Sequence, residues 1–208
     1  MTPARPTGHH HGDLRSALLR AALELLAERG AQGFTLAEAS RRAGVSVAAP
    51  YKHFADKEAL LAELARTGYE QQYERFSAAM AAEEDPTEQL GAFAAAYVRF
   101  AAHSKALFDI TFAAGLDKQL HPDLGRAGDR VLHLLGQPAG QLVGDPDEAL
   151  DLVHAVAATA HGFAAFLAEG VFGDPDEALE TTTRRARRAA RKLVTGRAER
   201  DRHLNQTR

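Results

Sequence analysis

The segment from Ser46 to Lys57, SVAAPYKHFADK, places small or apolar residues directly before a cluster of aromatic and cationic side chains. Small side chains at Val47, Ala48 and Ala49 would let a helix approach base edges in a DNA groove, where they contact thymine methyl groups without hydrogen bonds. The phenol, imidazole and ammonium groups that follow suit phosphate oxygens, and Lys57 adds the N-terminus of the next helix. The pattern indicates a surface that contacts DNA.

The same residues also fit an ordinary helix junction. Phe54 and Pro50 are of the kinds that a junction usually buries, and Tyr51 and His53 suit an amphipathic surface. Gly44 is equally explained as a simple helix C-cap. From the pattern alone, the DNA interpretation and the purely structural one are equally supported, because helical hairpins with short turns are common.

Composition limits the class of protein. The chain has 208 residues, of which 45% are apolar and 25% charged, which suits a folded protein of one or two domains. It has no cysteine, so disulfide frameworks and thiolate metal sites are excluded. No apolar run in the sequence approaches the length of a membrane span, and the N-terminal MTPARPTGHHHG lacks the apolar core of a signal peptide. We therefore expect a cytoplasmic protein without a membrane partner.

The charges are distributed unevenly along the chain. Residues 1–57 carry a net charge of +3, residues 58–183 carry −14, and residues 184–208 carry +8. An acidic middle segment repels nucleic acid. Any DNA-binding surface is therefore expected in the N-terminal segment or in the tail.

Apolar residues recur at the helical spacing nearly throughout, which predicts an all-α protein. The first helix is expected to begin with Asp13 as its N-cap and to stop at Gly30. The second is expected to begin at Thr35, where TLAE forms a capping box, and to end before Gly44. A third short helix, capped by Ser46, is expected to run to about residue 54.

The rest of the chain is expected to form longer helices. The predicted ranges are 57–83, 87–103, 105–116, 122–135, 146–169 and 175–194. The last two begin with the same heptapeptide, GDPDEAL, which supplies an Asp N-cap, a proline at the first helical position and acidic residues in the first turn. This heptapeptide is a repeated helix-start signal and not a duplicated domain.

Two short helices joined by the turn Ala43-Gly44-Val45-Ser46 and packed on a longer first helix have the layout of a helix-turn-helix unit. The run TLAEASRRAGVSVAAPYKHFADKEALLAELA resembles the N-terminal DNA-binding domain of the TetR family of transcriptional regulators, from about His10 to Ala65. The resemblance implies a three-helix DNA-binding domain followed by a larger helical domain that binds an effector and dimerises. The corresponding boundaries are 1–12 for a flexible arm, 13–56 for the helix-turn-helix domain, 57–196 for the helical domain and 197–208 for a flexible tail.

The resemblance also assigns roles to individual positions in the DNA-binding domain. The implied phosphate contacts are Thr35, Tyr51, His53 and Lys57, and the implied groove-lining residues are Ser46, Val47, Ala48, Ala49 and Lys52. Pro50 departs from the leucine that is commonest in the family at that point, although a branch with Ala-Pro-Tyr exists. We expect this proline to alter the tilt of the recognition helix.

The C-terminal half carries a weaker signal. The run from Thr159 to Gly170, TAHGFAAFLAEG, resembles a TetR C-terminal subclass named for a Trp-His-Gly signature, although this chain has no tryptophan. His161-Gly162 within a helix predicts a close helix approach. Aromatic and imidazole groups are candidates to line a pocket for a small apolar or aromatic effector, and each is also a plausible core residue. The candidates are Phe93, Tyr97, Phe100, Phe108, Phe112, His133, His154 and Phe163.

Two charged or imidazole runs remain at the ends of the chain. His9–His11 is interpreted as a native arm that reaches DNA backbone or minor groove, because a flexible terminus is a poor metal site. The basic run at residues 184–192 is interpreted as a solvated helix face. On the opposite face, a stripe of mostly small residues predicts helix packing across a homodimer. The stripe is Leu179, Thr183, Ala186, Ala190 and Leu193.

Together these features predict a homodimeric, ligand-responsive repressor that binds a palindromic operator in double-stranded DNA and needs no catalytic residue, metal or cofactor. An all-helical enzyme with a His/carboxylate site is the alternative, although the sequence has no His-Glu-x-x-His motif and no phosphate-binding loop. A helical protein-interaction adaptor is the third class. DNA binding that weakens steeply with salt would distinguish the regulator from both.

Overall fold

The computed structural model describes residues 11–113, 116–117 and 119–206, and helices make up most of this part of the chain. In chain order the elements are α1 (His11–Arg29), α2 (Leu36–Arg42), the 3-10 helix η1 (Pro50–Lys52), α3 (Lys57–Ala81), α4 (Pro86–His103), α5 (Lys105–Ala113), α6 (Pro122–Leu142), α7 (Pro146–Ala168) and α8 (Pro175–Gln206). No strand occurs among the described residues. The predicted all-α fold is confirmed.

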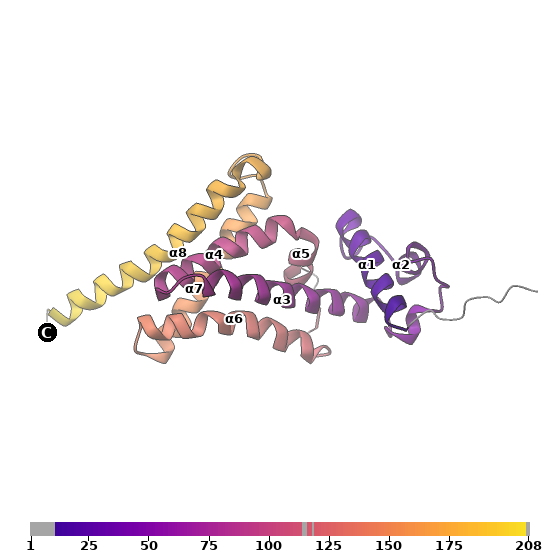
Figure 1. Cartoon of the computed structure of the whole chain (residues 1–208), viewed down its shortest axis with the longest axis horizontal. Helices are drawn as coiled ribbons and strands as arrows, with labels where there is room; N and C mark the ends of the chain where they lie inside the picture. The colour runs from indigo at the N-terminus through magenta and orange to yellow at the C-terminus, as the bar shows by residue number, and fades with distance from the viewer. Residues whose placement is uncertain (1–10, 114–115, 118, 207–208) are drawn as a thin grey trace, which may run out of the picture.

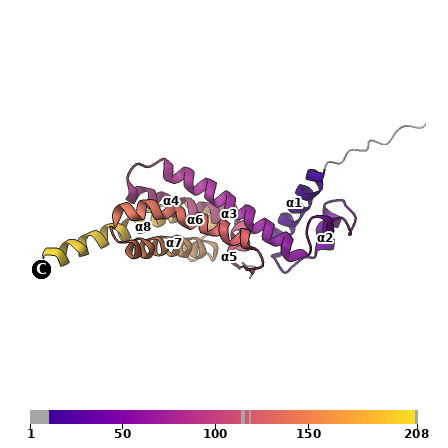
Figure 2. The ribbon, with the colours of Figure 1, turned by 90° about the horizontal axis from the view of Figure 1, so that it is seen from below.

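The helices form a small N-terminal unit and a larger bundle (Figure 1). α1 and α2 lie at one end of the molecule, and α3 runs from them into the bundle. α6 lies beside α3 in both views, and the end of α8 projects beyond the bundle (Figure 2). α3 therefore links the N-terminal unit mechanically to the larger bundle.

The N-terminal unit has its own apolar core. Leu18 and Leu25 of α1 are buried together with Phe34 and Phe54, which flank α2 and η1. Leu60 of α3 is fully buried in the same core. Burial of these groups fixes the positions of α2 and η1 relative to α1.

α4 lies at the centre of the larger bundle, where it contacts α3, α6, α7 and α8. The contact between α4 and α8 is close: a Cβ atom added at Gly91 would lie 3.0 Å from Cγ of Arg187. Ala186 and Ala190 are fully buried within the same chain. The small-residue stripe of α8 therefore packs inside the protein, and the prediction that it forms a dimer surface is wrong. Small side chains are needed there because α8 lies so close to its own α4.

The basic run of α8 is also partly engaged within the chain. Nη2 of Arg187 lies 2.8 Å from Oε1 of Glu83 and 2.7 Å from Oε2 of Glu88, and Nε of Arg191 lies 2.7 Å from Oε1 of Glu88. These ion pairs attach α8 to the start of α4. Two of the arginines predicted to be merely solvated thus have a structural role.

Several helix boundaries differ from the sequence-based expectation. α1 begins at His11, so Asp13 lies in the first turn and is not the N-cap, while the arm at residues 1–10 lies outside the described residues. α6 continues through the buried Pro138 to Leu142, because a proline removes only one helical hydrogen bond when neighbouring packing holds the helix. α8 continues to Gln206, so most of the predicted tail is helical.

The expectation that no apolar run approaches the length of a membrane span is wrong by length and composition, because α7 of the described chain is long and apolar enough to cross a membrane. Only 33% of its most apolar stretch is buried inside the protein. An apolar helix face that is exposed in a single chain also suits packing against a second chain.

Candidate DNA-binding face and ligand cavity

α2 is held in place by its capping residues. The backbone N–H of Glu38 donates to Oγ1 of Thr35 at 3.2 Å, and the backbone N–H of Thr35 donates to Oε2 of Glu38 at 2.8 Å, which completes the predicted capping box. Hydrogen bonds from the Thr35 side chain and backbone lower the pKa of the Glu38 carboxyl, with a smaller contribution from Arg29. The Thr35 hydroxyl is exposed, so it remains near the surface that would face a phosphate.

The turn after α2 requires a special backbone conformation. Gly44 has φ of +71°, in the left-handed region that glycine adopts without strain. The turn is closed by the backbone N–H of Val45, which donates to the carbonyl of Ser40 at 3.0 Å. A short α2, this glycine turn and the element that follows form the layout of a helix-turn-helix unit.

The element after the turn is shorter than predicted. Instead of an α-helix from Ser46 to about residue 54, the chain forms turns and then the 3-10 helix η1. Ser46 does not cap it with its side chain, since Ala49 occupies the N-cap position and makes no side-chain cap bond. Pro50 explains the difference, because its missing N–H cannot donate to the carbonyl four residues earlier. The N–H groups of Ala49, Lys52 and His53 instead bond to carbonyls three residues earlier.

The predicted groove residues lie on the surface of this element. Val47 is 51% exposed, and Ser46, Ala48 and Lys52 are also exposed. Ala49 is half-buried. The structure thus presents a row of small side chains with a lysine at its end, over the buried Pro50 that anchors the element to the core.

The predicted phosphate contacts surround the same element. Tyr51 is 61% exposed. Nζ of Lys57 lies 4.7 Å from the centre of the Phe34 ring, at the first position of α3, where Asp56 accepts a hydrogen bond from the N–H of Ala59. Nε2 of His53 is buried and has no hydrogen-bond partner within the described chain. A buried polar atom without a partner is costly, and because it is buried this nitrogen does not face the surface that would meet a phosphate.

Ion pairs within the unit remove other cations from this surface. Arg42 of α2 makes two hydrogen bonds to Glu28 of α1, at 2.6 and 2.8 Å. The bond from Arg42 lowers the pKa of the Glu28 carboxyl. Arg29 donates to Glu38 at 3.1 Å. Lys52 and Lys57 are paired with no carboxylate in the described structure, so their charges are available to DNA.

A ligand-sized cavity of about 340 Å³ lies inside the larger bundle. We call it the inner cavity, and it is bounded by α3, α4, α5, α6 and α7. Its lining residues are Tyr69, Gln72, Phe93, Tyr97, Phe112, Gly128, Asp129, Val131, Leu132, Ala157, Ala158 and His161. It is therefore mainly apolar and aromatic, with a few polar groups.

Tyr97 and His161 form the polar centre of the inner cavity. The Tyr97 hydroxyl lies 3.0 Å from Nδ1 of His161, and burial raises the pKa of the Tyr97 phenol well above its ordinary value. Tyr97 stays protonated, so its hydroxyl is able to donate. The imidazole of His161 lies 4.9 Å from the Phe112 ring and 5.7 Å from the Phe108 ring, which hold its orientation.

Two further polar side chains connect α3 with α5. The Tyr69 hydroxyl donates to the carbonyl of Thr111 at 3.0 Å, and Nε2 of Gln72 donates to Oγ1 of Thr111 at 3.3 Å. Gln72 is only 1% exposed. Burial, and to a lesser extent the charge of Asp129, raises the pKa of the Tyr69 phenol. A ligand that displaced these groups would act directly on the contact between α3 and α5.

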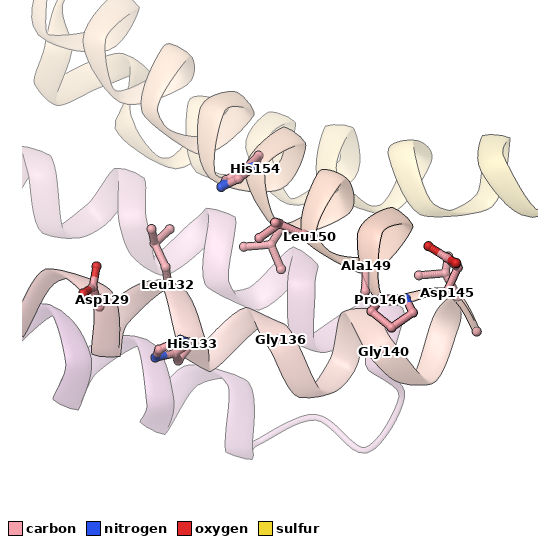
Figure 3. Close-up of a pocket in the computed structure, with 13 residues that line it drawn as sticks. Asp129, Leu132, His133, Gly136, Gly140, Asp145, Pro146, Ala149, Leu150 and His154 are labelled. Atoms are coloured by element: carbon pink, nitrogen blue, oxygen red, sulfur yellow. The ribbon is translucent and has the colours of Figure 1, made fainter. Parts of the chain in front are cut away.

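A second, more open hollow of about 640 Å³ lies between α6 and α7, and we call it the outer groove (Figure 3). Asp129 and Leu132 line both hollows, so the two meet at these residues. Leu132 of α6 and Leu150 of α7 extend into the space between the helices (Figure 3). The outer groove thus adjoins the inner cavity at Asp129 and Leu132.

The structure separates the predicted effector residues into three groups. Phe93, Tyr97 and Phe112 line the inner cavity, His133 and His154 line the outer groove, and Phe100, Phe108 and Phe163 line neither. Of the last group, Phe100 packs in the core 6.0 Å from the ring of Phe76, Phe108 supports His161, and Phe163 lies 5.9 Å from the ring of Phe172.

Sequence reasoning missed four polar residues of the inner cavity: Tyr69, Gln72, Asp129 and His161. Gln72 could have been identified from the sequence, because it is a polar residue on the apolar face of α3. His161 was predicted only to take part in a close helix approach with Gly162. Asp129 carried no signal, because an exposed acidic residue on an amphipathic helix is ordinary.

Comparisons with known proteins agree with this architecture. Residues 18–64 match the family described as bacterial regulatory proteins, tetR family, and residues 90–189 match the tetracyclin repressor-like C-terminal domain. No curated protein sequence matches the chain.

Three solved structures show the same fold. A protein with unknown function from Rhodococcus sp. RHA1 is 30% identical, with 88% of this chain and 98% of that chain covered and a TM-score of 0.71. The TetR family transcriptional regulator PfmR from Thermus thermophilus is 22% identical, with coverage of 85% and 96% and a TM-score of 0.64. FadR from Bacillus subtilis, solved in complex with stearoyl-CoA, is 16% identical, with coverage of 82% and 96% and a TM-score of 0.66.

A helix-turn-helix unit joined through a long helix to a bundle with a ligand-sized cavity defines the class of ligand-responsive, DNA-binding transcription regulators. Within that class, the chain belongs to the TetR family.

Proposed function

We propose that the protein is a homodimeric cytoplasmic repressor that binds a palindromic operator and is released from it when a small effector enters the inner cavity. The observation that carries the proposal is the surface of η1. There, small exposed side chains lie beside Lys52 and Lys57, two cations with no carboxylate partner in the described structure. Such a surface fits a DNA groove, with phosphates on its rim.

Each site residue has a stated role in this proposal. Ser46, Val47, Ala48, Ala49 and Lys52 face the groove, and Thr35, Tyr51, His53 and Lys57 contact phosphates. Exposure of Tyr51 supports its assignment, whereas Nε2 of His53 is buried and would reach a phosphate only if its side chain moved. No catalytic role is proposed for any residue.

The homodimer is supported by α7. Phe166 is 50% exposed, Val171 is 58% exposed, and a Cβ atom added at Gly162 would meet nothing within 4 Å in the single chain. An exposed apolar face beside a glycine with open space suits close packing against a second copy. A two-fold dimer places two copies of η1 on half-sites about 34–36 Å apart or at a multiple of that spacing.

Effector control is supported by the position of α5. Phe112 on α5 lines the inner cavity, while Ala106, Asp109 and Ile110 on the same helix border a cleft shared with the end of α1. A ligand that moves α5 or α3 therefore acts on the N-terminal unit, and a shift of a few ångströms spoils simultaneous docking on both half-sites.

The experiment that tests the proposal is footprinting of the purified protein on the intergenic DNA beside its own gene. We expect a protected, two-fold symmetric site and binding that weakens steeply as salt rises. Binding with no sequence preference at any salt concentration would exclude the operator assignment.

A further inference from the structure

The charges that line the inner cavity and outer groove are unbalanced. Among the described residues that line them, none is lysine or arginine, and the carboxylates are Asp129 and Asp145. Asp145 is occupied as the N-cap of α7, where it accepts hydrogen bonds from the N–H groups of Asp147 and Glu148 at 2.9 and 3.0 Å. Asp129 is therefore the carboxylate that remains for a ligand.

The cations that neighbour Asp129 along α6 are engaged elsewhere. Arg126 forms an ion pair with Asp123. The guanidinium of Arg130 lies over the ring of Tyr73, 4.5 Å from its centre. In the part of the chain that the structure describes, no cation pairs with Asp129, although its charge acts on the Tyr69 phenol inside the cavity.

Aromatic rings surround the space beside this carboxylate. Tyr69, Phe93, Tyr97 and Phe112 all line the inner cavity. The centre of the Tyr97 ring lies 5.8 Å from that of Phe93 and 6.3 Å from that of Phe112, so these rings pack against one another and form a continuous aromatic wall of the cavity. The face of an aromatic ring attracts a cation within about 6 Å.

We propose that the effector is a lipophilic organic cation, an amine or quaternary ammonium. Its charge lies between the Asp129 carboxylate and the aromatic rings of the inner cavity, and its apolar part fills the cavity. This inference rests on the proposed role of the inner cavity as the effector site. Asp129 is exposed to solvent, which weakens its charge by screening, but an anionic effector would still meet that charge without an arginine or lysine among the lining residues to compensate it.

The net charge of the whole domain also favours a positively charged ligand. Residues 58–183, which include every residue that lines the two hollows, carry a net charge of −14. Such a field raises the local concentration of cations and speeds their association, an effect that falls with ionic strength. The local site and the surrounding charge thus select for the same class of ligand.

The test uses three probes of nearly equal shape: benzyltrimethylammonium, its neutral isostere neopentylbenzene, and the anion benzylsulfonate. Each is titrated into the full-length protein without DNA, and binding is followed by calorimetry and ligand-observed NMR. We expect benzyltrimethylammonium to bind at least about tenfold more tightly than benzylsulfonate, because the two differ mainly in the sign of their charge.

Two variants test which residues cause the preference for the cation. Asp129→Asn keeps the shape of the side chain and removes its charge, so it should weaken the cation about fivefold, strengthen the anion and leave neopentylbenzene within about twofold. Phe112→Leu removes a ring face and keeps an apolar side chain, so it should weaken the cation more than the neutral probe. The matched control is Glu74→Gln, an exposed carboxylate of α3 that lines neither hollow, which should change none of the three affinities.

The outcomes separate this inference from the proposed function. Benzylsulfonate that binds as tightly as the cation, or an equal loss for all three probes in Asp129→Asn, would overturn the cation assignment even if the protein binds its operator. A protein that prefers the cation as described but protects no operator would leave the cation site standing and remove its role as the effector site.

Discussion

Lys57 is the first residue of α3, at the helix N-terminus, and its ammonium lies over the Phe34 ring. We expect Lys57→Ala to weaken binding to operator and to random DNA alike, because a phosphate contact carries no sequence information. The slope of log K against log salt should fall by about one unit for each phosphate that the variant no longer neutralises. Filter binding across a salt series measures both quantities, and a change in base preference would contradict the assignment.

Ala49 has the opposite role in the proposal, as a groove-lining residue; it is half-buried at the N-cap of η1 and carries no polar group. Ala49→Gln adds an amide that collides with base edges or makes new hydrogen bonds to them. We expect the preferred operator to change while weak, salt-driven binding to random DNA stays almost the same. Selection from a randomised half-site library checks this, with Gln137→Glu on α6 as a control that should leave operator choice unchanged.

At the residue scale, the sequence predicted the types of residue that line the ligand site better than it predicted which individual residues do so. Phe93, Tyr97 and Phe112 were expected in a pocket and line one, whereas Phe100 was expected there and packs in the core. Helical spacing identifies which residues point inward, but it does not say where packing leaves a cavity. A role for Asp129 is indicated only by the folded structure, in which Asp129 and Tyr69 line the same cavity.

Among the elements, the helix starts were the most predictable. Asp85, Asp145 and Asp174 each accept a hydrogen bond from a backbone N–H group in the first turn of the following helix, as the Asp-Pro pattern indicates. The recognition element was not predictable in the same way. Its hydrogen bonds depend on Pro50, whose ring is buried in the core, and sequence patterns do not distinguish a short α-helix from a 3-10 turn held by packing.

Glu63 joins two elements, because its carboxylate accepts from Arg66 on α3 at 2.6 Å and lies 2.5 Å from Nη2 of Arg15 on α1. Burial acts to raise the pKa of the Glu63 carboxyl, but the two arginines outweigh it, so the pKa is lowered from 4.5. A carboxyl with a lowered pKa stabilises the folded state above pH 4.5, and this contribution is lost as the pH falls through the folded-state value.

We therefore expect Glu63→Gln to destabilise the docking of α1 on α3 by about 1 kcal/mol at neutral pH. The difference from the wild type should shrink below pH 4.5, where the wild-type carboxyl becomes protonated. Hydrogen exchange of the α1 amides at both pH values measures it. Glu70→Gln is the matched control, since Glu70 also pairs with Arg66 but makes no contact with α1 in the described structure. An effect of equal size in both variants would show that the contact with Arg15 contributes nothing.

At the scale of the whole molecule, the C-terminal half of α7 is a surface on which the single chain leaves apolar side chains exposed. The sequence predicted a dimer there and on α8, but it assigned the small residues of α8 to the wrong partner. Ala186 and Ala190 face α4 of the same chain, whereas Gly162 of α7 has open space beside it. Spacing reveals a stripe that permits close approach, but not which helix will approach it.

Phe166 lies on this α7 surface, 50% exposed and 5.9 Å from the ring of Phe172. In the proposed dimer, Phe166→Glu places a charge in an apolar interface, where it is desolvated without a partner. We expect the variant to be monomeric at micromolar concentration by sedimentation velocity, while the wild type is dimeric. Gln137→Glu adds the same charge on α6 and should remain dimeric.

Operator binding should fall in the same variant for a reason that involves both domains. A dimer holds two copies of η1 at a fixed spacing, so the second half-site is bound at a high effective concentration, and a monomer loses that advantage. We expect Phe166→Glu to lose about a hundredfold or more in affinity for the full operator and to keep its affinity for an isolated half-site. If the variant were monomeric yet bound the full operator like the wild type, the protein would read DNA as a single chain, and the two-fold geometry proposed here would be wrong.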